Sequence, residues 1–260
     1  MQGGGGLGFL VRVVGVTVRP LVLAAWSGSV VASWLYRRLP EGGGRLVRVS
    51  PLLSVRGDRL VPILSGVEGS GPLVVGEGRR VAVELVMEEM AGLDVVAGVE
   101  RALEEWGVRP VEVAVRSVSV GPGRLEYPGG RGTVLVEASY GPTIHVFRGR
   151  RVLYPSPARL LGSAARSLGE RLGRDLSGLA RELLDHFELS GHRTRTVRLG
   201  IGRGRTVKAF HGDALFIASL ERLDDILALL DSARIYGVGK SRGIGFGYFD
   251  YRLVGSGHEL

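Results

Sequence analysis

The chain has 260 residues, of which 45% are hydrophobic and 23% charged, so it can bury one large core or two small ones and is not wholly disordered. Its formal net charge of +8 favours an anionic partner such as nucleic acid, with an arginine-rich soluble surface as the alternative. Without cysteine there are no disulfides or thiolate metal sites, and the five histidines lack metal-ligand spacing. We therefore expect no metal and no cofactor.

Residues 21–36 are largely apolar but do not predict a membrane span. The run is shorter than the roughly 20 residues needed, and serines and a glycine interrupt it. No basic residue precedes Arg12, which argues against a signal peptide. We expect a cytoplasmic protein with no membrane partner.

The first half of the chain predicts the order strand, helix, strand, strand, helix, strand. A valine-rich run opens it, and apolar residues at steps of three and four mark the two helices. Pro40 and the glycines at 42–44 are expected to end the first helix. A glycine-rich hairpin or loop is expected at 65–78. The predicted segments are 9–19, 23–34, 45–55, 80–87, 96–106 and 110–120.

The second half repeats this order after a glycine-rich connection at 121–132. Its first helix continues towards residue 187, with Gly173 as a point of division. The predicted segments are strands at 133–138 and 143–147, a helix from 161, strands at 193–200 and 206–219, a helix at 223–230 and a strand at 244–254. The sequence thus predicts an α+β fold of two tandem ferredoxin-like (RRM-like) βαββαβ domains, 1–130 and 131–260.

The segment 237–247, Gly-Val-Gly-Lys-Ser-Arg-Gly-Ile-Gly-Phe-Gly, joins the last helix to the last strand. Glycines allow positive φ and close approach of another molecule, and the exposed N–H groups with two cations suit phosphate. A nucleotide-binding P-loop is disfavoured because Arg234 occupies the position of its first glycine. A purely structural glycine-rich turn remains the alternative.

A basic segment from His192 to Lys208 contains no acidic residue. Arg193 and Arg195 share one strand face, as do Arg203 and Arg205. A hairpin turning at 200–204 would bring the two rows together as a cationic ladder for RNA phosphates. The alternative is a solvated basic hairpin.

The pattern of 237–247 resembles the C-terminal glycine-rich signature of the repeat-associated mysterious proteins of CRISPR systems. Within that superfamily the chain is similar to the Cas6 endoribonucleases. Weaker similarities lie at Tyr140–Thr143, Tyr154–Pro157, 207–212, Tyr36 and 49–52.

The resemblance implies metal-independent cleavage of precursor CRISPR RNA within repeats, by attack of a 2′-hydroxyl, to give mature guide RNAs. Many members use a histidine in the first domain, whereas this chain has none before His145. The catalytic candidates are therefore Tyr36, Lys240 and His145. The RNA-binding candidates are Arg37, Arg38, Arg193, Arg195, Arg203, Arg205, Gly237, Gly239, Ser241, Arg242, Gly245 and Gly247.

A second function stays open, that of a non-catalytic RNA-binding subunit of a CRISPR effector complex. The missing early histidine favours it, and the presence of two complete domains favours the nuclease. The expected partners are CRISPR repeat RNA and, in the second case, other effector subunits. The chain is expected to be a monomer or a homodimer.

Overall fold

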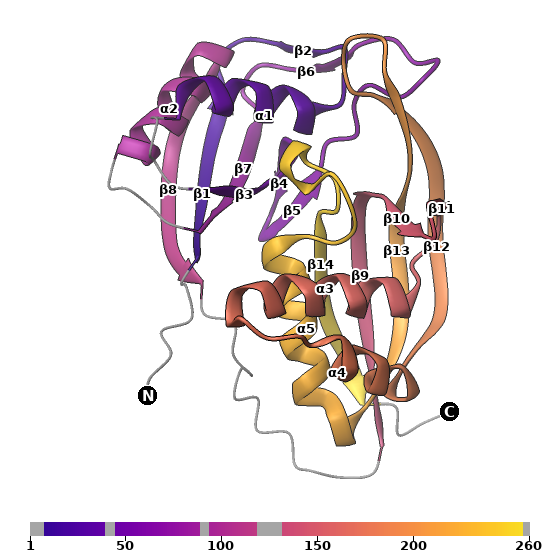
Figure 1. Cartoon of the computed structure of the whole chain (residues 1–260). Helices are drawn as coiled ribbons and strands as arrows, with labels where there is room; N and C mark the ends of the chain where they lie inside the picture. The colour runs from indigo at the N-terminus through magenta and orange to yellow at the C-terminus, as the bar shows by residue number, and fades with distance from the viewer. Residues whose placement is uncertain (1–7, 40–44, 89–93, 119–131, 257–260) are drawn as a thin grey trace.

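The computed structural model describes residues 8–39, 45–88, 94–118 and 132–256, which form two large antiparallel sheets with helices on them (Figure 1). Two small two-stranded sheets, β2-β6 and β10-β11, accompany them. The predicted end of the first helix at 40–44 and the connection around 121–131, where the domain division was placed, lie outside these residues. Among the described helices, none is long and apolar enough to cross a membrane.

The first sheet has the strand order β5-β4-β7-β1-β8, with β3 also pairing with β7. Helices α1 and α2 connect its strands, and their apolar faces pack with β1 and β7 around one core. The elements are β1 Gly8–Thr17, β2 Leu21–Leu23, α1 Ser27–Arg38, β3 Leu46–Val49, β4 Leu53–Arg56, β5 Arg59–Pro62, β6 Leu73–Val75, β7 Arg80–Met87, α2 Asp94–Trp106 and β8 Val108–Val118.

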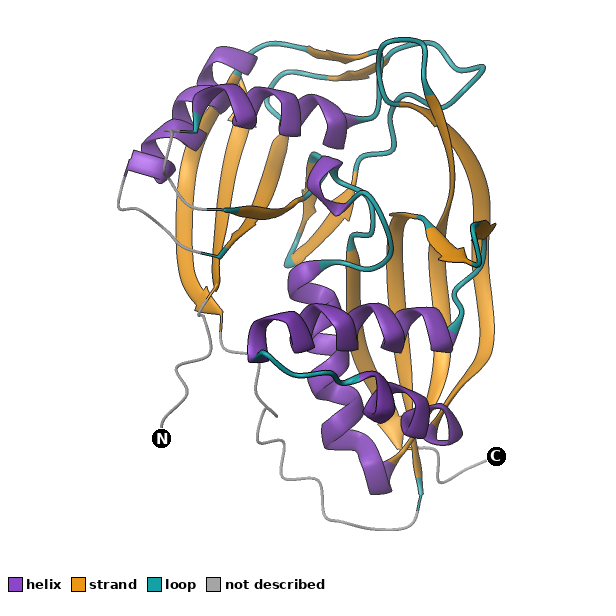
Figure 2. Cartoon of the chain, viewed as in Figure 1, coloured by secondary structure: helices purple, strands orange, loops and turns teal. Residues whose placement is uncertain are grey.

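The second sheet has the order β12-β13-β9-β14. Its elements are β9 Thr133–Thr143, β10 His145–Phe147, β11 Arg150–Val152, α3 Pro157–Leu172, α4 Ser177–Glu182, β12 Phe187–Gly200, β13 Thr206–Ser219, α5 Leu223–Tyr236 and β14 Phe249–Ser256, with short 3-10 turns at Leu183–His186, Leu220–Arg222 and Arg242–Ile244. Figure 2 shows α3 and α5 on the same side of this sheet.

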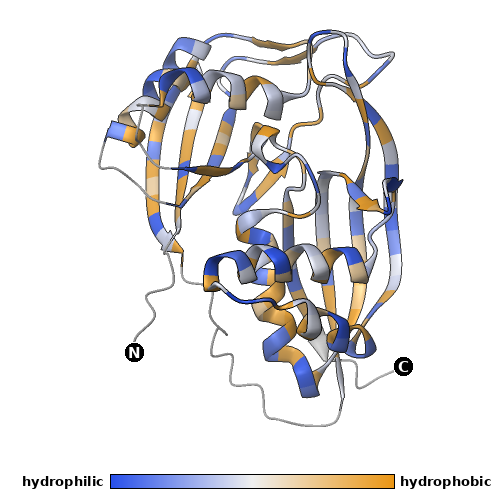
Figure 3. Cartoon of the chain, in the orientation of Figure 1, coloured by the Kyte–Doolittle hydropathy of each residue, from blue (hydrophilic) through white to orange (hydrophobic). Residues whose placement is uncertain are grey.

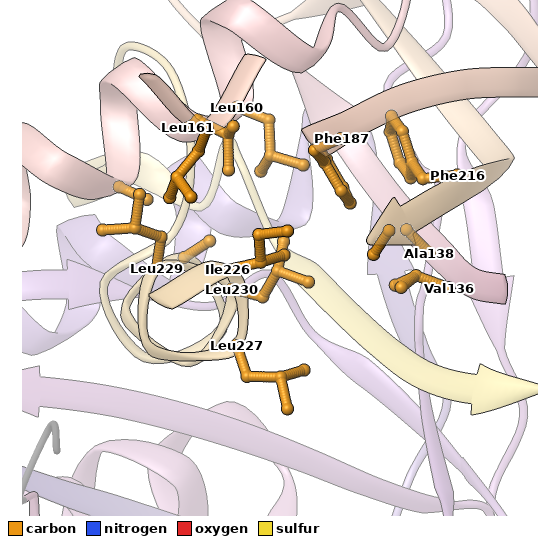
Figure 4. Close-up of a cluster of buried hydrophobic side chains, with 14 of the residues drawn as sticks. Val136, Ala138, Leu160, Leu161, Phe187, Phe216, Ile226, Leu227, Leu229 and Leu230 are labelled. Carbon is orange, nitrogen blue, oxygen red and sulfur yellow. The ribbon is translucent and has the colours of Figure 1, made fainter. Parts of the chain in front are cut away.

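In the first sheet β1 lies between β7 and β8, and in the second β9 lies between β13 and β14. These neighbours are antiparallel, and the first strand of each unit thus lies between its third and fourth, as a βαββαβ unit requires. The predicted α+β class with two ferredoxin-like units is confirmed. Buried leucines of α3 and α5 meet Phe187 and Phe216 over the second sheet (Figure 4). Figure 3 shows hydrophobic colour along the strands and much of α5, and hydrophilic bands on α3 and α4.

The predicted division at Gly173 is confirmed, whereas three predicted strands differ from the structure. The segment 45–55 is divided into β3 and β4, β12 begins at Phe187 rather than at residue 193, and the last strand also begins elsewhere. Gly173 does divide the predicted long helix, because it takes a left-handed φ of 63° and ends α3. The last strand begins at Phe249 rather than at residue 244, because residues 242–244 form a 3-10 turn instead.

The halves meet where the glycine-rich segment of the second half rests on α1 of the first. Gly28, in the first turn of α1, faces Gly245: a Cβ on Gly28 would lie 2.6 Å from the Ile244 carbonyl oxygen and 2.7 Å from the Gly245 Cα. The Trp26 indole N–H donates to the same Ile244 carbonyl at 3.0 Å. Glycine is thus required here for backbone-to-backbone approach.

We predict that Gly28→Ala lowers the free energy of unfolding by about 1–3 kcal/mol, because the added methyl forces two backbones apart. The matched control is Gly162→Ala in α3, where an added Cβ meets nothing within 4 Å. That change should stabilise by about 0.5–1 kcal/mol, as expected for a helix interior. Urea unfolding of both variants decides this, and an unchanged midpoint for Gly28→Ala would contradict the close contact.

Candidate nucleic-acid interface

The glycine-rich segment 237–247, called the glycine loop below, has buried stems and an exposed tip. Gly237, Gly245 and Gly247 are buried, whereas Lys240 and Ser241 are exposed. These three glycines adopt φ of 74°, 81° and 74°, and Ser241 also has a positive φ of 63°. The glycines thus allow the backbone to fold tightly at the stems, which leaves the centre of the loop exposed to solvent.

Most backbone N–H groups of the glycine loop bond within the protein. Val238 donates to Gly247, Lys240 to Ile144, and Gly247 to Pro142. A Cβ on Gly247 would lie only 1.9 Å from the Val238 carbonyl oxygen. Gly239 donates to Ser163 Oγ and Gly245 to the Arg242 carbonyl, so the expectation that Gly239, Gly245 and Gly247 offer free N–H groups to RNA is replaced by a structural role. Gly237 is buried.

At the tip the situation differs. Within the described part of the chain, the N–H groups of Ser241, Arg242 and Gly243 have no protein partner. These three amides, with the exposed Lys240 side chain, are what the loop offers to a phosphate.

The side chain of Arg242 turns inward rather than towards solvent. Its Nη1 donates to Ser167 Oγ on α3 at 2.5 Å and to the Tyr236 carbonyl at 3.4 Å. Burial, followed by the nearby Arg171 guanidinium, lowers the pKa of Arg242. Arg242 therefore ties the loop to α3, and no carboxylate within ion-pair distance offsets its charge among the residues described.

Tyr36 lies on the first-half side of the tip. It belongs to the last turns of α1 and is 55% exposed. A Cβ on Gly243 would lie 3.4 Å from the Tyr36 hydroxyl oxygen. The docking of the loop on α1 thus sets the predicted tyrosine against the loop tip, although the two are about 200 residues apart in sequence.

A hollow of about 480 Å³ beside Tyr36, called the α1 groove below, gathers more of the predicted residues. Arg37 of α1 and Arg203 and Arg205 of the β12–β13 turn line it. Arg38 does not, because it pairs with Glu105 of α2 at 2.6 Å. The sequence named these three arginines as RNA-binding candidates, but it placed Arg203 and Arg205 in the basic hairpin and not beside Tyr36. Arg38 is corrected to a surface ion pair.

A second hollow, of about 700 Å³, lies on the other side of the tip between α3 and α4 and is called the α3–α4 groove below. Lys240 and His145 both line it, so the structure brings these two candidates together and separates them from Tyr36. Four arginines that the sequence reasoning missed also line it: Arg159, Arg166, Arg174 and Arg181. Helical spacing of arginine on one face of 157–172 was the available signal.

The α3–α4 groove has an excess of positive charge. Among the described residues, its four arginines and Lys240 form no ion pair within 4 Å. Two carboxylates, Glu170 and Asp175, also line the groove and leave the cations in the majority. Such a surface attracts a polyanion, with a salt-dependent affinity.

His145 lines this groove from its floor. It is 2% exposed, its ring packs on Phe210, and its Nε2 has no hydrogen-bond partner. Burial, with a contribution from Arg159, lowers the pKa of His145 to about 4. The ring is therefore neutral at pH 7 and unsuited to donate a proton as an imidazolium.

The basic hairpin forms as predicted, but its two arginine rows do not meet. In the β12–β13 register Arg193 faces Asp213 and Arg195 faces His211, whereas Arg203 and Arg205 lie at the turn. Arg195 and Gly200 are separated by five strand residues, or roughly 17 Å. The predicted ladder of four is corrected to two separate pairs, because Arg203 and Arg205 lie in the turn itself, whereas Arg193 and Arg195 lie further along β12.

The turn of this hairpin crosses to the first half. The backbone N–H of Trp26 donates to the Gly200 carbonyl at 2.8 Å, and the backbone N–H of Gly200 donates to the Gly66 carbonyl at 2.8 Å. These bonds carry Arg203 and Arg205 to α1 and explain why they share a groove with Tyr36.

Comparison with known proteins relates the second half of the chain to a protein family. Residues 139–249 match the family of the CRISPR-associated endoribonuclease Cas6, which confirms the resemblance that the glycine-rich segment predicted. No curated protein matches the sequence.

Solved structures agree over almost the whole chain. A Thermus thermophilus Cas6 has a TM-score of 0.60 at 19% identity, with 96% of this chain and 100% of that chain covered. A Cas6 in a substrate mimic complex has a TM-score of 0.60 at 17% identity, with 94% and 99% covered. A partial Cas6-RT-Cas1–Cas2 complex gives 0.63 at 10% identity, with 98% and 47% covered. At these identities the likeness establishes the fold.

We predict that His145 makes stability fall in acid. The folded protein holds the pKa of His145 at about 4, below the usual 6.5 of a histidine in the unfolded chain, so its contribution to stability is full above pH 6.5 and is lost as pH falls to 4. The loss is on the order of 3 kcal/mol, and His145→Phe should remove it from the pH dependence of urea unfolding. An NMR titration that finds the His145 ring protonating near pH 6.5 would contradict the burial argument.

Proposed function

We propose that this chain, whose residues 139–249 form the domain of the CRISPR-associated Cas6 family, is an endoribonuclease that cleaves precursor CRISPR RNA within its repeats. One observation carries the proposal. The exposed tip of the glycine loop lies between two cation-lined grooves, with the Tyr36 hydroxyl on one side and Lys240 on the other.

The two grooves define a path for an RNA strand. Arg37, Arg203 and Arg205 contact the phosphates on the α1 side, and Arg166 and Arg174 contact them on the α3 side. The scissile phosphate lies over the tip, where the free amides of 241–243 and the Lys240 ammonium meet it. Phosphate contacts of this kind position the strand, and unpaired bases supply the sequence reading.

The chemistry requires three functions at that phosphate. The 2′-hydroxyl oxygen attacks phosphorus while the bond to the 5′-oxygen breaks, which leaves a 2′,3′-cyclic phosphate and a 5′-hydroxyl. A base takes the proton of the attacking hydroxyl, an acid gives one to the leaving oxygen, and cations stabilise the charge on the phosphoryl oxygens.

We assign proton transfer to Tyr36 and charge stabilisation to Lys240. Both groups are exposed and flank the tip. Positioning for in-line attack supplies much of the acceleration when proton transfer is weak. His145 is too deeply buried and too weakly basic for either role, so we assign it to the floor of the α3–α4 groove as a neutral hydrogen-bonding group.

One observation favours the alternative, a non-catalytic RNA-binding subunit of a CRISPR effector complex. Among the histidines that the structure describes, only His145 lines either groove, and it is buried. The tip would then bind a repeat phosphate without cleaving it, and the same cations would serve for binding alone.

We predict that the protein cleaves end-labelled repeat RNA in EDTA and leaves intact a substrate with one 2′-deoxy sugar at the cut site. The reason is that the attacking group is the 2′-hydroxyl, and no metal takes part in the proposed steps. Tyr36→Phe should slow single-turnover cleavage by about 10²–10⁴-fold, the usual contribution of a general acid or base. Tight binding of both RNAs with no cleavage of either would establish the binding subunit instead.

We predict that Arg166→Glu with Arg174→Glu weakens RNA binding and lowers the salt slope by about 0.7 for each lost phosphate contact. Both residues are exposed and not in ion pairs, so the fold should survive. The matched control is Arg109→Glu with Arg116→Glu on β8, which reverses the same number of exposed charges at the edge of the first sheet. Fluorescence anisotropy at several salt concentrations measures both variants, and equal effects from the two would refute the groove as the RNA path.

A further inference from the structure

Arg48, on β3, is a buried arginine that no step of the proposed chemistry uses. It is 1% exposed and belongs to the first half of the chain. Its Nη1 donates to the carbonyls of Arg234 at 2.6 Å and Ile235 at 2.7 Å. These carbonyls belong to the last turn of α5, immediately before the glycine loop.

The same guanidinium also meets the far stem of the loop. Its central carbon lies 5.1 Å from the ring centre of Tyr248, the residue that follows Gly247. Arg48 therefore contacts the chain just before and just after the glycine loop. A helix C-terminus has unsatisfied carbonyls and partial negative charge, which is where a guanidinium fork binds well.

A buried carboxylate completes the arrangement. Glu84 on β7 is 5% exposed and lies between Arg48, at 3.5 Å, and Arg12, at 2.6 Å. A buried ion pair is a poor way to gain stability, because desolvation of both charges costs several kcal/mol. A directional pair does, however, fix the relative placement of the two elements that it joins.

We infer that Arg48 is a positioning residue that sets the glycine loop of the second half against Tyr36 of the first. This inference rests on the proposed function. Trp26 and Gly28 hold the second stem of the loop on α1, at Ile244 and Gly245. Arg48 binds the chain on both flanks of the loop, at the end of α5 and at Tyr248. With both anchors in place the tip has one position relative to the tyrosine hydroxyl.

Loop docking can be measured without RNA. The chain has three tryptophans, and Trp26 is fully buried against Phe246 with its indole N–H bonded to the loop. In a Trp34→Phe, Trp106→Phe background, emission and acrylamide quenching report on Trp26 alone. Into this background go Arg48→Met, Arg48→Lys and the double variant Arg48→Met with Glu84→Met. The double variant removes Arg48 together with its buried carboxylate partner, and Arg12, which loses the same partner, has a side chain that is 37% exposed and can be solvated. The double variant should therefore stay folded.

We expect Arg48→Met and the double variant to shift Trp26 emission to the red and to slow single-turnover cleavage by about 10–100-fold, because a misplacement of about 1 Å at a reacting centre has that effect. The RNA dissociation constant should change much less, since Arg48 is buried. Arg48→Lys should restore part of both losses. Arg45→Met is the control, because Arg45 lies next to β3 and forms an exposed ion pair with Glu88.

A folded double variant with wild-type Trp26 emission and wild-type cleavage would overturn the assignment. If Trp26 emission shifts as expected but the wild-type protein does not cleave repeat RNA, the positioning of the loop stands and the proposed nuclease fails. A red shift in Arg45→Met equal to that in Arg48→Met would also overturn it.

Discussion

The backbone contact between Gly28 and Gly245 is the constraint on which the rest of the site depends. It allows a loop at the end of the second half to rest directly on the first helix of the chain. The loop then presents its tip between the two halves, with Tyr36 on one side and Lys240 on the other. The glycines of the loop stems consequently fold and dock the loop, and in the proposed function contact with RNA is left to the tip.

Charge is distributed according to the same division. Cations near the loop stems face inward: Arg48 binds the end of α5, and Arg242 binds Ser167 of α3. Cations around the tip face solvent without carboxylate partners in the described chain, as Lys240 and Arg166 do. The inward set fixes geometry, and the outward set provides the field that a polyanion meets.

Local pattern predicted most of the fold. The strands β1, β7 and β8, the apolar helix faces and the turn at Gly173 follow from spacing and from glycine conformation, and they lie close to where they were expected. The repeated βαββαβ order could be predicted because the sequence pattern of each half indicates it independently. Tyr36, Arg37, Arg203 and Arg205 were named from sequence and do share one groove.

The remaining features depend on contacts between distant segments, which spacing cannot supply. The inward turn of Arg242 needs Ser167, and the pairing of Arg38 needs Glu105. The hairpin arginines are separated because one pair lies in the turn and the other lies along β12, opposite Asp213 and His211. The α3–α4 groove was missed because its arginines form a cationic surface only together with Lys240, which the fold brings to the same groove.

Hydrogen–deuterium exchange across the glycine loop, with and without a bound 2′-deoxy repeat RNA, tests the central claim most directly. In the free protein the amides of Val238, Lys240 and Gly247 should exchange slowly, because each donates to a backbone carbonyl, while those of 241–243 exchange fast. Bound RNA should then protect 241–243 selectively. Saturating RNA that leaves 241–243 as fast as in the free protein would show that the tip does not hold the scissile phosphate.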